Sequence, residues 1–131
     1  MGGKAIAMPT DLSDAAACSA LAPKAVEAFG QLDVVCNVAG AFRFDHATAI
    51  TPEIWDRIHG VNVRGPFFVI QSALPYLIER AGSVVNVASA SAFLGHAYLT
   101  HYASSKAALV NLTKSLAMEY IQSPVRINAI A

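Results

Sequence analysis

The sequence predicts an α/β fold built on a parallel sheet. Apolar runs of strand length alternate with longer segments whose apolar residues recur at helical spacing, in the order β-α-β-α-β-α-β. This alternation implies right-handed crossovers with helices packed on the sheet. The composition agrees, because 55% of the 131 residues are hydrophobic and only 14% are charged, as expected of a chain with a large buried interior.

The first third of the chain predicts a strand, a helix and a second strand. The apolar run Lys4–Met8 is expected to be a short buried strand. A helix is expected from about Asp14 to Phe29, because its apolar residues have helical spacing and Gly30 supplies a C-terminal stop. Pro23 predicts a break or kink inside this helix. The nearly continuous apolar run Leu32–Asn37 is typical of a strand covered on both faces.

The rest of the chain predicts two long helices and two strands. The first helix is expected from Pro52 to about Arg80, with a bend at Gly65-Pro66. The valine-rich segment Gly82–Ala88 is the clearest strand. A polar loop then leads to a helix from about His101 to Gln122, and Val125–Ile130 is the last strand.

The polar loops that follow the expected strands are the first place to look for a site, because ligands of such sheets bind outside the carboxyl ends of the strands. These loops contain Asp11, residues 37–41 and residues 89–98.

Tyr102 and Lys106 are four residues apart, so they share one face of the last helix. Ionising a free phenol at neutral pH costs about 4 kcal/mol, and one ammonium roughly 4 Å away supplies about that much at an effective dielectric of ~20. Lys106 is therefore suited to make Tyr102 an acid and base. On its own, a Tyr and a Lys four residues apart are common on surface helices. The pair therefore indicates a catalytic site only together with further polar residues.

Two further polar residues accompany the pair. Ser89 comes 13 residues before Tyr102, at the carboxyl end of the valine-rich strand, and Asn62 lies in the preceding long helix. With these residues the whole chain resembles the short-chain dehydrogenase/reductase family. The positions that match the family signature in order and spacing are Asn37-Val38-Ala39-Gly40, Asn62, Ser89, Tyr102 and Lys106.

The resemblance implies an oxidoreductase that interconverts an alcohol and a carbonyl with NAD(P)(H). By this resemblance Tyr102 donates or removes the proton, and Lys106 lowers the pKa of Tyr102 and holds the nicotinamide ribose. Ser89 is implied to hydrogen-bond the reacting oxygen. Asn62 is implied to hold a helix irregularity and a water that links Lys106 to solvent.

The resemblance also implies a nicotinamide cofactor, NAD or NADP, and a small-molecule alcohol or carbonyl substrate. Asp11 matches the acidic residue that contacts the adenine ring, and the turn after the second strand matches the one beside the adenine ribose. The implied cofactor-binding residues are Asp11, Leu12, Asn37, Ala39, Gly40, Tyr102 and Lys106.

By the same resemblance, residues 1–131 are part of an NAD(P)-binding Rossmann-like domain, a three-layer α/β/α arrangement with strands 3 to 6 of the doubly wound order. The family's Gly-rich turn and first two strands would precede Met1, and its substrate-binding segment would follow Ala131. Strand Lys4–Met8 is then expected either to pair with Leu32–Asn37 or to be loosely held. The family further implies a dimer or tetramer built on the two long helices.

An alternative is a catalytically inactive truncated fragment that only associates with full-length relatives. Other classes are less well supported. A net charge of zero gives no field for a nucleic-acid backbone. The chain has no Gly-x-Ser-x-Gly or Ser-x-x-Lys motif of a hydrolase.

No metal site, disulfide or membrane segment is expected. His96 and His101 lack a carboxylate or cysteine at ligand spacing, so both are expected to line the substrate loop or lie on the surface. Cys36 is interpreted as a buried reduced thiol. The polar residues of the uncharged stretch 81–105 disfavour a membrane span, and we expect a soluble cytoplasmic protein.

Overall fold

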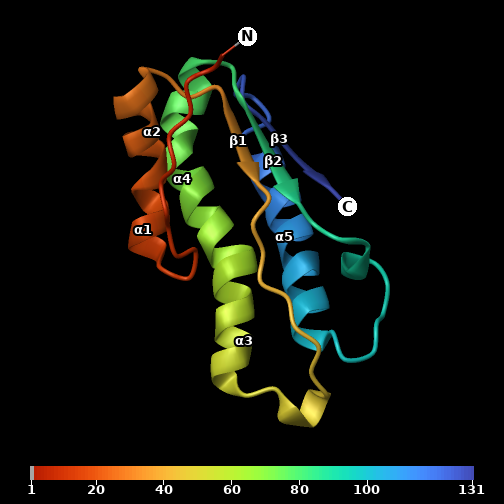
Figure 1. Ribbon diagram of the computed structural model, residues 1–131. Helices are drawn as coiled ribbons and strands as arrows, with labels where there is room; N and C mark the ends of the chain where they lie inside the picture. The colour runs from red at the N-terminus through yellow and green to blue at the C-terminus, as the bar shows by residue number, and fades with distance from the viewer. Residues whose placement is uncertain (1) are drawn as a thin grey trace.

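The computed structural model describes residues 2–131 and contains a three-stranded parallel sheet (Figure 1). Its strands are β1 (Val34–Asn37), β2 (Ser83–Val87) and β3 (Arg126–Ile130), in the order β1-β2-β3. The register places Val35 beside Val84. The predicted α/β class with a parallel sheet is therefore confirmed, and three of the four expected strands form.

Five α-helices accompany the sheet. They are α1 (Ala15–Ser19), α2 (Leu21–Phe29), α3 (Pro52–His59), α4 (Gly65–Glu79) and α5 (Thr100–Glu119). Helices α1 and α2 run alongside α4 (Figure 1), and α3 packs against α5. None of the helices among residues 2–131 has both the length and the apolar character needed to cross a bilayer.

The core lies between one face of the sheet and helices α4 and α5. Val35, Val84 and Ile127 supply the strand side chains, and α4 supplies Ile70 and Leu77, which are fully buried. Each such side chain stabilises the fold by about 1.5–3 kcal/mol. The described residues therefore form the sheet and one helical layer of the expected three-layer arrangement.

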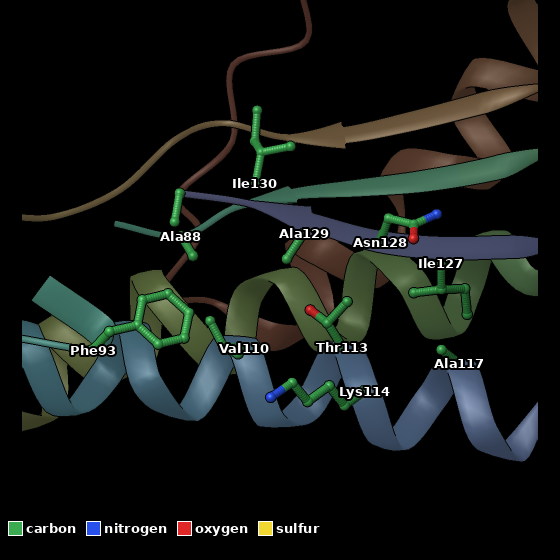
Figure 2. A pocket seen from close by; sticks show the side chains of 11 residues that line it. Ala88, Phe93, Val110, Thr113, Lys114, Ala117, Ile127, Asn128, Ala129 and Ile130 are labelled. Carbon is green, nitrogen blue, oxygen red and sulfur yellow. The ribbon is translucent and has the colours of Figure 1, made fainter. Parts of the chain in front are cut away.

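The opposite face of the sheet is open. Val34 is 52% exposed and Ile130 is 58% exposed, and in Figure 2 the Ile130 side chain points away from α5. Cys36 is also exposed, so its interpretation as a buried thiol was wrong. The physical reason is the pleat: alternate residues of β1 face opposite sides, and Cys36 faces the uncovered one.

The expected strand Lys4–Met8 does not form and does not pair with β1, so the strand prediction and the pairing alternative were wrong. Residues 2–7 are exposed, and the sheet bonds β1 to β2 alone. A strand needs a neighbour to satisfy its backbone groups, and within residues 2–131 the sheet pairs this segment with none of its strands. Side-chain contacts tie it to α2 instead, since Lys4 Nζ donates to the carbonyl of Ala28 at 3.1 Å and lies 5.2 Å from the Phe29 ring centroid.

The two proline-containing helices are interrupted one turn before the positions expected. The helix expected over 14–29 divides into α1 and α2 at Ala20, because Pro23 has no N–H to donate to the carbonyl four residues earlier. Gly30 ends α2 at φ +82°, as predicted. Likewise the long helix contains a π-helical segment at Gly60–Arg64, because Pro66 cannot donate to the carbonyl of residue 62.

Candidate active site

Lys106 is the charged group at the centre of the site. It is 4% exposed, and its Nζ donates a hydrogen bond to the carbonyl of Val87 at 2.8 Å, at the end of β2. Burial lowers the pKa of this ammonium from its ordinary value of 10.5, because desolvation penalises the charged form. A Cβ on Gly40 would lie 3.5 Å from Nζ, so the glycine leaves room for the amine.

Tyr102 lies one helical turn before Lys106, as its spacing predicts. The ammonium nitrogen lies 5.9 Å from the Tyr102 ring centroid. The ring of Phe42 meets the Tyr102 ring edge to face, with centroids 4.9 Å apart. The phenol is half-buried, so it is open to a ligand while packed on one side.

Asn62 is fully buried in the π-helical segment and joins three parts of the site. Its Oδ1 accepts from the N–H of Ala41 at 2.7 Å, and its Nδ2 donates to the carbonyl of Ala41 at 2.9 Å. The same Nδ2 donates to Ser105 Oγ at 2.9 Å, and that hydroxyl donates to the carbonyl of Tyr102 at 2.7 Å. The turn after β1 is therefore connected to the helix that carries Tyr102 and Lys106.

Ser89 follows β2 directly and lies two residues after the carbonyl that Lys106 binds. Its Oγ accepts a hydrogen bond from the N–H of Ser91 at 3.2 Å, at the start of a 3₁₀ turn over Ala90–Ala92. Because the oxygen acts here as an acceptor, the hydroxyl proton stays available to a ligand.

Four of the five expected cofactor residues that lie outside α5 line one open groove of about 630 Å³. These are Asp11, Leu12, Ala39 and Gly40. Asp11 Oδ1 accepts from the N–H and the hydroxyl of Ser13, at 2.9 and 2.8 Å. These hydrogen bonds, the backbone one first, lower the pKa of the Asp11 carboxyl, so it is charged at neutral pH. Arg57 and Val61 also line the groove.

Asn37 does not line that groove and belongs to a polar network across the sheet. Its Nδ2 donates to Asn86 Oδ1 at 2.8 Å. Asn86, fully buried, donates to Thr113 Oγ1 on α5 at 2.9 Å, and that hydroxyl donates to the carbonyl of Leu109 at 2.7 Å. Sequence reasoning did not identify this network, although a lone Asn in a valine-rich strand is a signal that could have found it.

His101 is fully buried, so the expectation that it lines the substrate loop or lies on the surface was wrong. Its Nε2 lies 3.2 Å from Asp45 Oδ2, and the Asp45 side chain is only 7% exposed. Asp45 is 56 positions away in the sequence, which explains why local spacing did not reveal the pair. His96 is exposed, as one of the two expected alternatives states.

A separate pocket of about 320 Å³ lies between β3 and α5 (Figure 2). Phe93 and Ala88 stand at one end, and Ala117 and Ile127 at the other. Tyr102 and Lys106 do not line this pocket. Phe93, four residues after Ser89 in the sequence, lines this pocket together with Ala88, the residue that follows β2.

The comparison with protein families matches the whole chain, residues 1–131, to the model described as short chain dehydrogenase. The chain is also 40% identical over 130 residues to 4-formylbenzenesulfonate dehydrogenase of Comamonas testosteroni. This alignment covers 98% of the chain and 52% of that enzyme.

Two solved structures resemble the fold closely. A Serratia marcescens short-chain dehydrogenase/reductase mutant superposes with a TM-score of 0.91 and 32% identity, over 98% of this chain and 52% of that one. A short chain dehydrogenase from Burkholderia cenocepacia J2315 in complex with NADP gives a TM-score of 0.88 and 32% identity, over 93% and 50%. The chain spans about half the length of the relatives it matches.

Proposed function

The chain belongs to the short-chain dehydrogenase family, and we propose that its site interconverts an alcohol and a carbonyl compound with NAD or NADP. The observation that carries this proposal is the position of a buried ammonium, Lys106, one helical turn from the half-buried phenol of Tyr102. No carboxylate of residues 2–131 lies within 4.0 Å of that ammonium. No carboxylate of the described residues therefore neutralises the positive charge of Lys106 close to the Tyr102 phenol.

Tyr102 is the proposed acid and base. In the reducing direction its hydroxyl gives a proton to the oxygen that becomes the alcohol, and in the oxidising direction the phenolate takes it back. Lys106 places its ammonium beside the Tyr102 ring, and its Nζ is held by the carbonyl of Val87. Ser89 is proposed to hold the same reacting oxygen, since its hydroxyl proton is not used within the 3₁₀ turn.

The described residues fit the adenosine side of a dinucleotide. The groove beside Asp11 and Leu12 reaches Gly40. A Cβ at Gly40 would lie 3.3 Å from Asn62 Oδ1 and would narrow the groove at this point. Asp11 carries the charged acceptor expected for an adenine amino group. When bound, the nicotinamide accepts or supplies the hydride, while Lys106 would hold its ribose.

A second candidate follows from the free edge of β1. In the part of the chain that the structure describes, this strand bonds β2 on one side only, and the neighbouring Val38 is 65% exposed. An unpaired apolar edge favours pairing with another chain. The alternative function is therefore association with a full-length relative without catalysis, and co-purification with such a relative would support it.

The test is the binding of nicotinamide nucleotides by the purified chain. Titration with NADH and with NADPH, followed by nucleotide fluorescence, is expected to show saturable binding that Asp11→Ala weakens. Asp56→Ala is the matched control, because Asp56 is an exposed carboxylate that does not line this groove. No saturable binding of either nucleotide would contradict the proposal and leave the association role. Action in the cytoplasm and assembly into a dimer or tetramer are further proposals from the family.

A further inference from the structure

The segment after β1 makes three contacts with the start of α5 and the loop before it, and the proposed mechanism does not use these contacts. The segment runs over residues 41–50, and the contacts reach Tyr98, His101 and Tyr102. All three lie within five residues of one another, and the last is the proposed acid and base.

The first contact is between the side chains of Asp45 and His101. The imidazole is fully buried, and its Nε2 lies 3.2 Å from Asp45 Oδ2; by hydrogen-bond geometry, neither ring nitrogen nor that oxygen has a partner among the described residues. Asp45 is also held by Arg43, whose Nε lies 2.7 Å from Oδ2. Two buried polar side chains in close contact next to the reactive residue limit where the backbone of residue 102 can lie.

The second contact comes from the backbone of Asp45. Its N–H donates to the carbonyl of Tyr98 at 3.0 Å. Tyr98 has φ +65°, a left-handed conformation that costs energy for a bulky residue and persists only when its surroundings hold it. Asp45 is therefore part of what holds the loop before α5 in a strained shape.

The third contact is the Phe42 ring against the Tyr102 ring, at 4.9 Å and 87°. Phe42 lies between two anchors of its own segment. Ala41 is bound on both backbone groups by Asn62, and Asp45 is bound to His101. These two anchors hold the backbone on both sides of Phe42, whose ring packs on Tyr102 although 53% of the residue is exposed.

We propose that Asp45 is a positioning residue for Tyr102. It fastens the segment 41–50 to His101 and Tyr98, and so fixes both the backbone before Tyr102 and the Phe42 ring that packs on its phenol. The role of Tyr102 itself rests on the proposed function above, but the positioning does not require turnover.

The experiment follows the Tyr102 ring directly. The chain is labelled with 3-fluorotyrosine, and the Tyr102 resonance is assigned as the ¹⁹F signal lost in Tyr102→Phe. Spectra are compared for wild type, Asp45→Asn, His101→Gln and the double variant, with circular dichroism to check the fold. Asp33→Asn is the matched control, since Asp33 pairs with Arg80 at 3.1 Å on the surface, with side chains 47% and 46% exposed.

Each single variant is expected to move or broaden the Tyr102 signal by more than its linewidth, while Tyr76 and Tyr120, on α4 and after α5, keep theirs. The double variant is expected to move the Tyr102 signal no further than Asp45→Asn alone, because both substitutions remove the same contact between Asp45 and His101. Asp33→Asn is expected to leave Tyr102 unmoved. If Asp45→Asn does not fold, His101→Gln carries the test, because Asp45 then keeps Arg43 as a partner.

An unmoved Tyr102 signal in the folded variants would overturn the positioning role, as would equal changes at Tyr76 and Tyr120, which indicate general loosening. Neither result depends on cofactor or substrate. Failure of catalysis with a moved signal would reject the proposed reaction and keep the positioning role.

Discussion

Asn62 and Ala41 form a two-way hydrogen-bonded pair. The side-chain oxygen accepts from the Ala41 N–H at 2.7 Å, and the side-chain nitrogen donates to the Ala41 carbonyl at 2.9 Å. Asn62 thus satisfies both backbone groups of the residue after Gly40, where the turn leaves the sheet. The π-helical segment around Asn62 is accordingly part of the site's construction.

Replacing Asn62 with Ala is expected to lower the free energy of unfolding by about 3 kcal/mol, because several part-buried polar groups lose their partner. Urea denaturation measures this loss. Asn128→Ala is the control, since Asn128 is exposed on β3, and it is expected to change stability by about 0.5 kcal/mol or less. Equal losses in the two variants would contradict the structural role of Asn62.

The network across the sheet gives a second prediction. Thr113→Val is expected to cost about 2 kcal/mol, because the buried Asn86 amide loses the hydroxyl that accepts its hydrogen bond. Thr100→Val, at an exposed position, is the matched control in the same urea experiment. If both threonines tolerate valine equally, the network does not contribute to stability.

Gly65 allows a close approach between α4 and the Asp11–Ser13 turn. A Cβ there would lie 2.5 Å from the carbonyl oxygen of Leu12, so Gly65→Ala is expected to cost about 2 kcal/mol and to displace that turn. The same variant is expected to weaken nucleotide binding in the groove. A Cβ on Gly95 meets nothing within 4 Å, so Gly95→Ala is expected to leave thermal stability and binding unchanged; a matching loss would refute the prediction.

Lys106 is expected to make the free energy of unfolding depend on pH in the alkaline range. Its pKa is lowered in the folded state by burial, so below that folded pKa the charged form costs stability. This cost is released as the pH rises from the folded pKa towards 10.5, the ordinary value. Lys106→Met is therefore expected to raise the Tm near pH 7 and to lose this advantage near about pH 10.

The control for this experiment is Lys114→Met, because Lys114 is exposed. Its Tm difference from wild type is expected to stay small between the two pH values. A Lys106→Met difference that does not change with pH would show that burial of the charge is not what shifts the stability.

The elements with an unambiguous pattern were predicted closely. β2 begins and ends within one residue of the expected segment Gly82–Ala88, because its valines favour a strand over a helix. The apolar segment Lys4–Met8 was also expected to be a strand and yet forms none, since a strand depends on a neighbour that the local pattern does not reveal. The sequence therefore predicts well which segments prefer a strand conformation, and predicts poorly which segments pair in a sheet.

The site shows the same division. The spacing of Tyr102 and Lys106 on one helix could be predicted, because four residues are about one turn. The contacts of Asp45 with His101, and of Phe42 with Tyr102, join residues more than 50 positions apart, and no local period connects them. His101 was placed wrongly for this reason.

The most direct test of the central claim is the rate of cofactor oxidation by the purified chain, with a panel of aldehydes and ketones, for wild type and Tyr102→Phe. The phenylalanine keeps the ring that Phe42 packs against and removes the hydroxyl. Wild type is expected to oxidise NADH or NADPH measurably, and the variant is expected to lose roughly 10²-fold or more of that rate. Equal rates for the two proteins would contradict a role for Tyr102 as the acid and base.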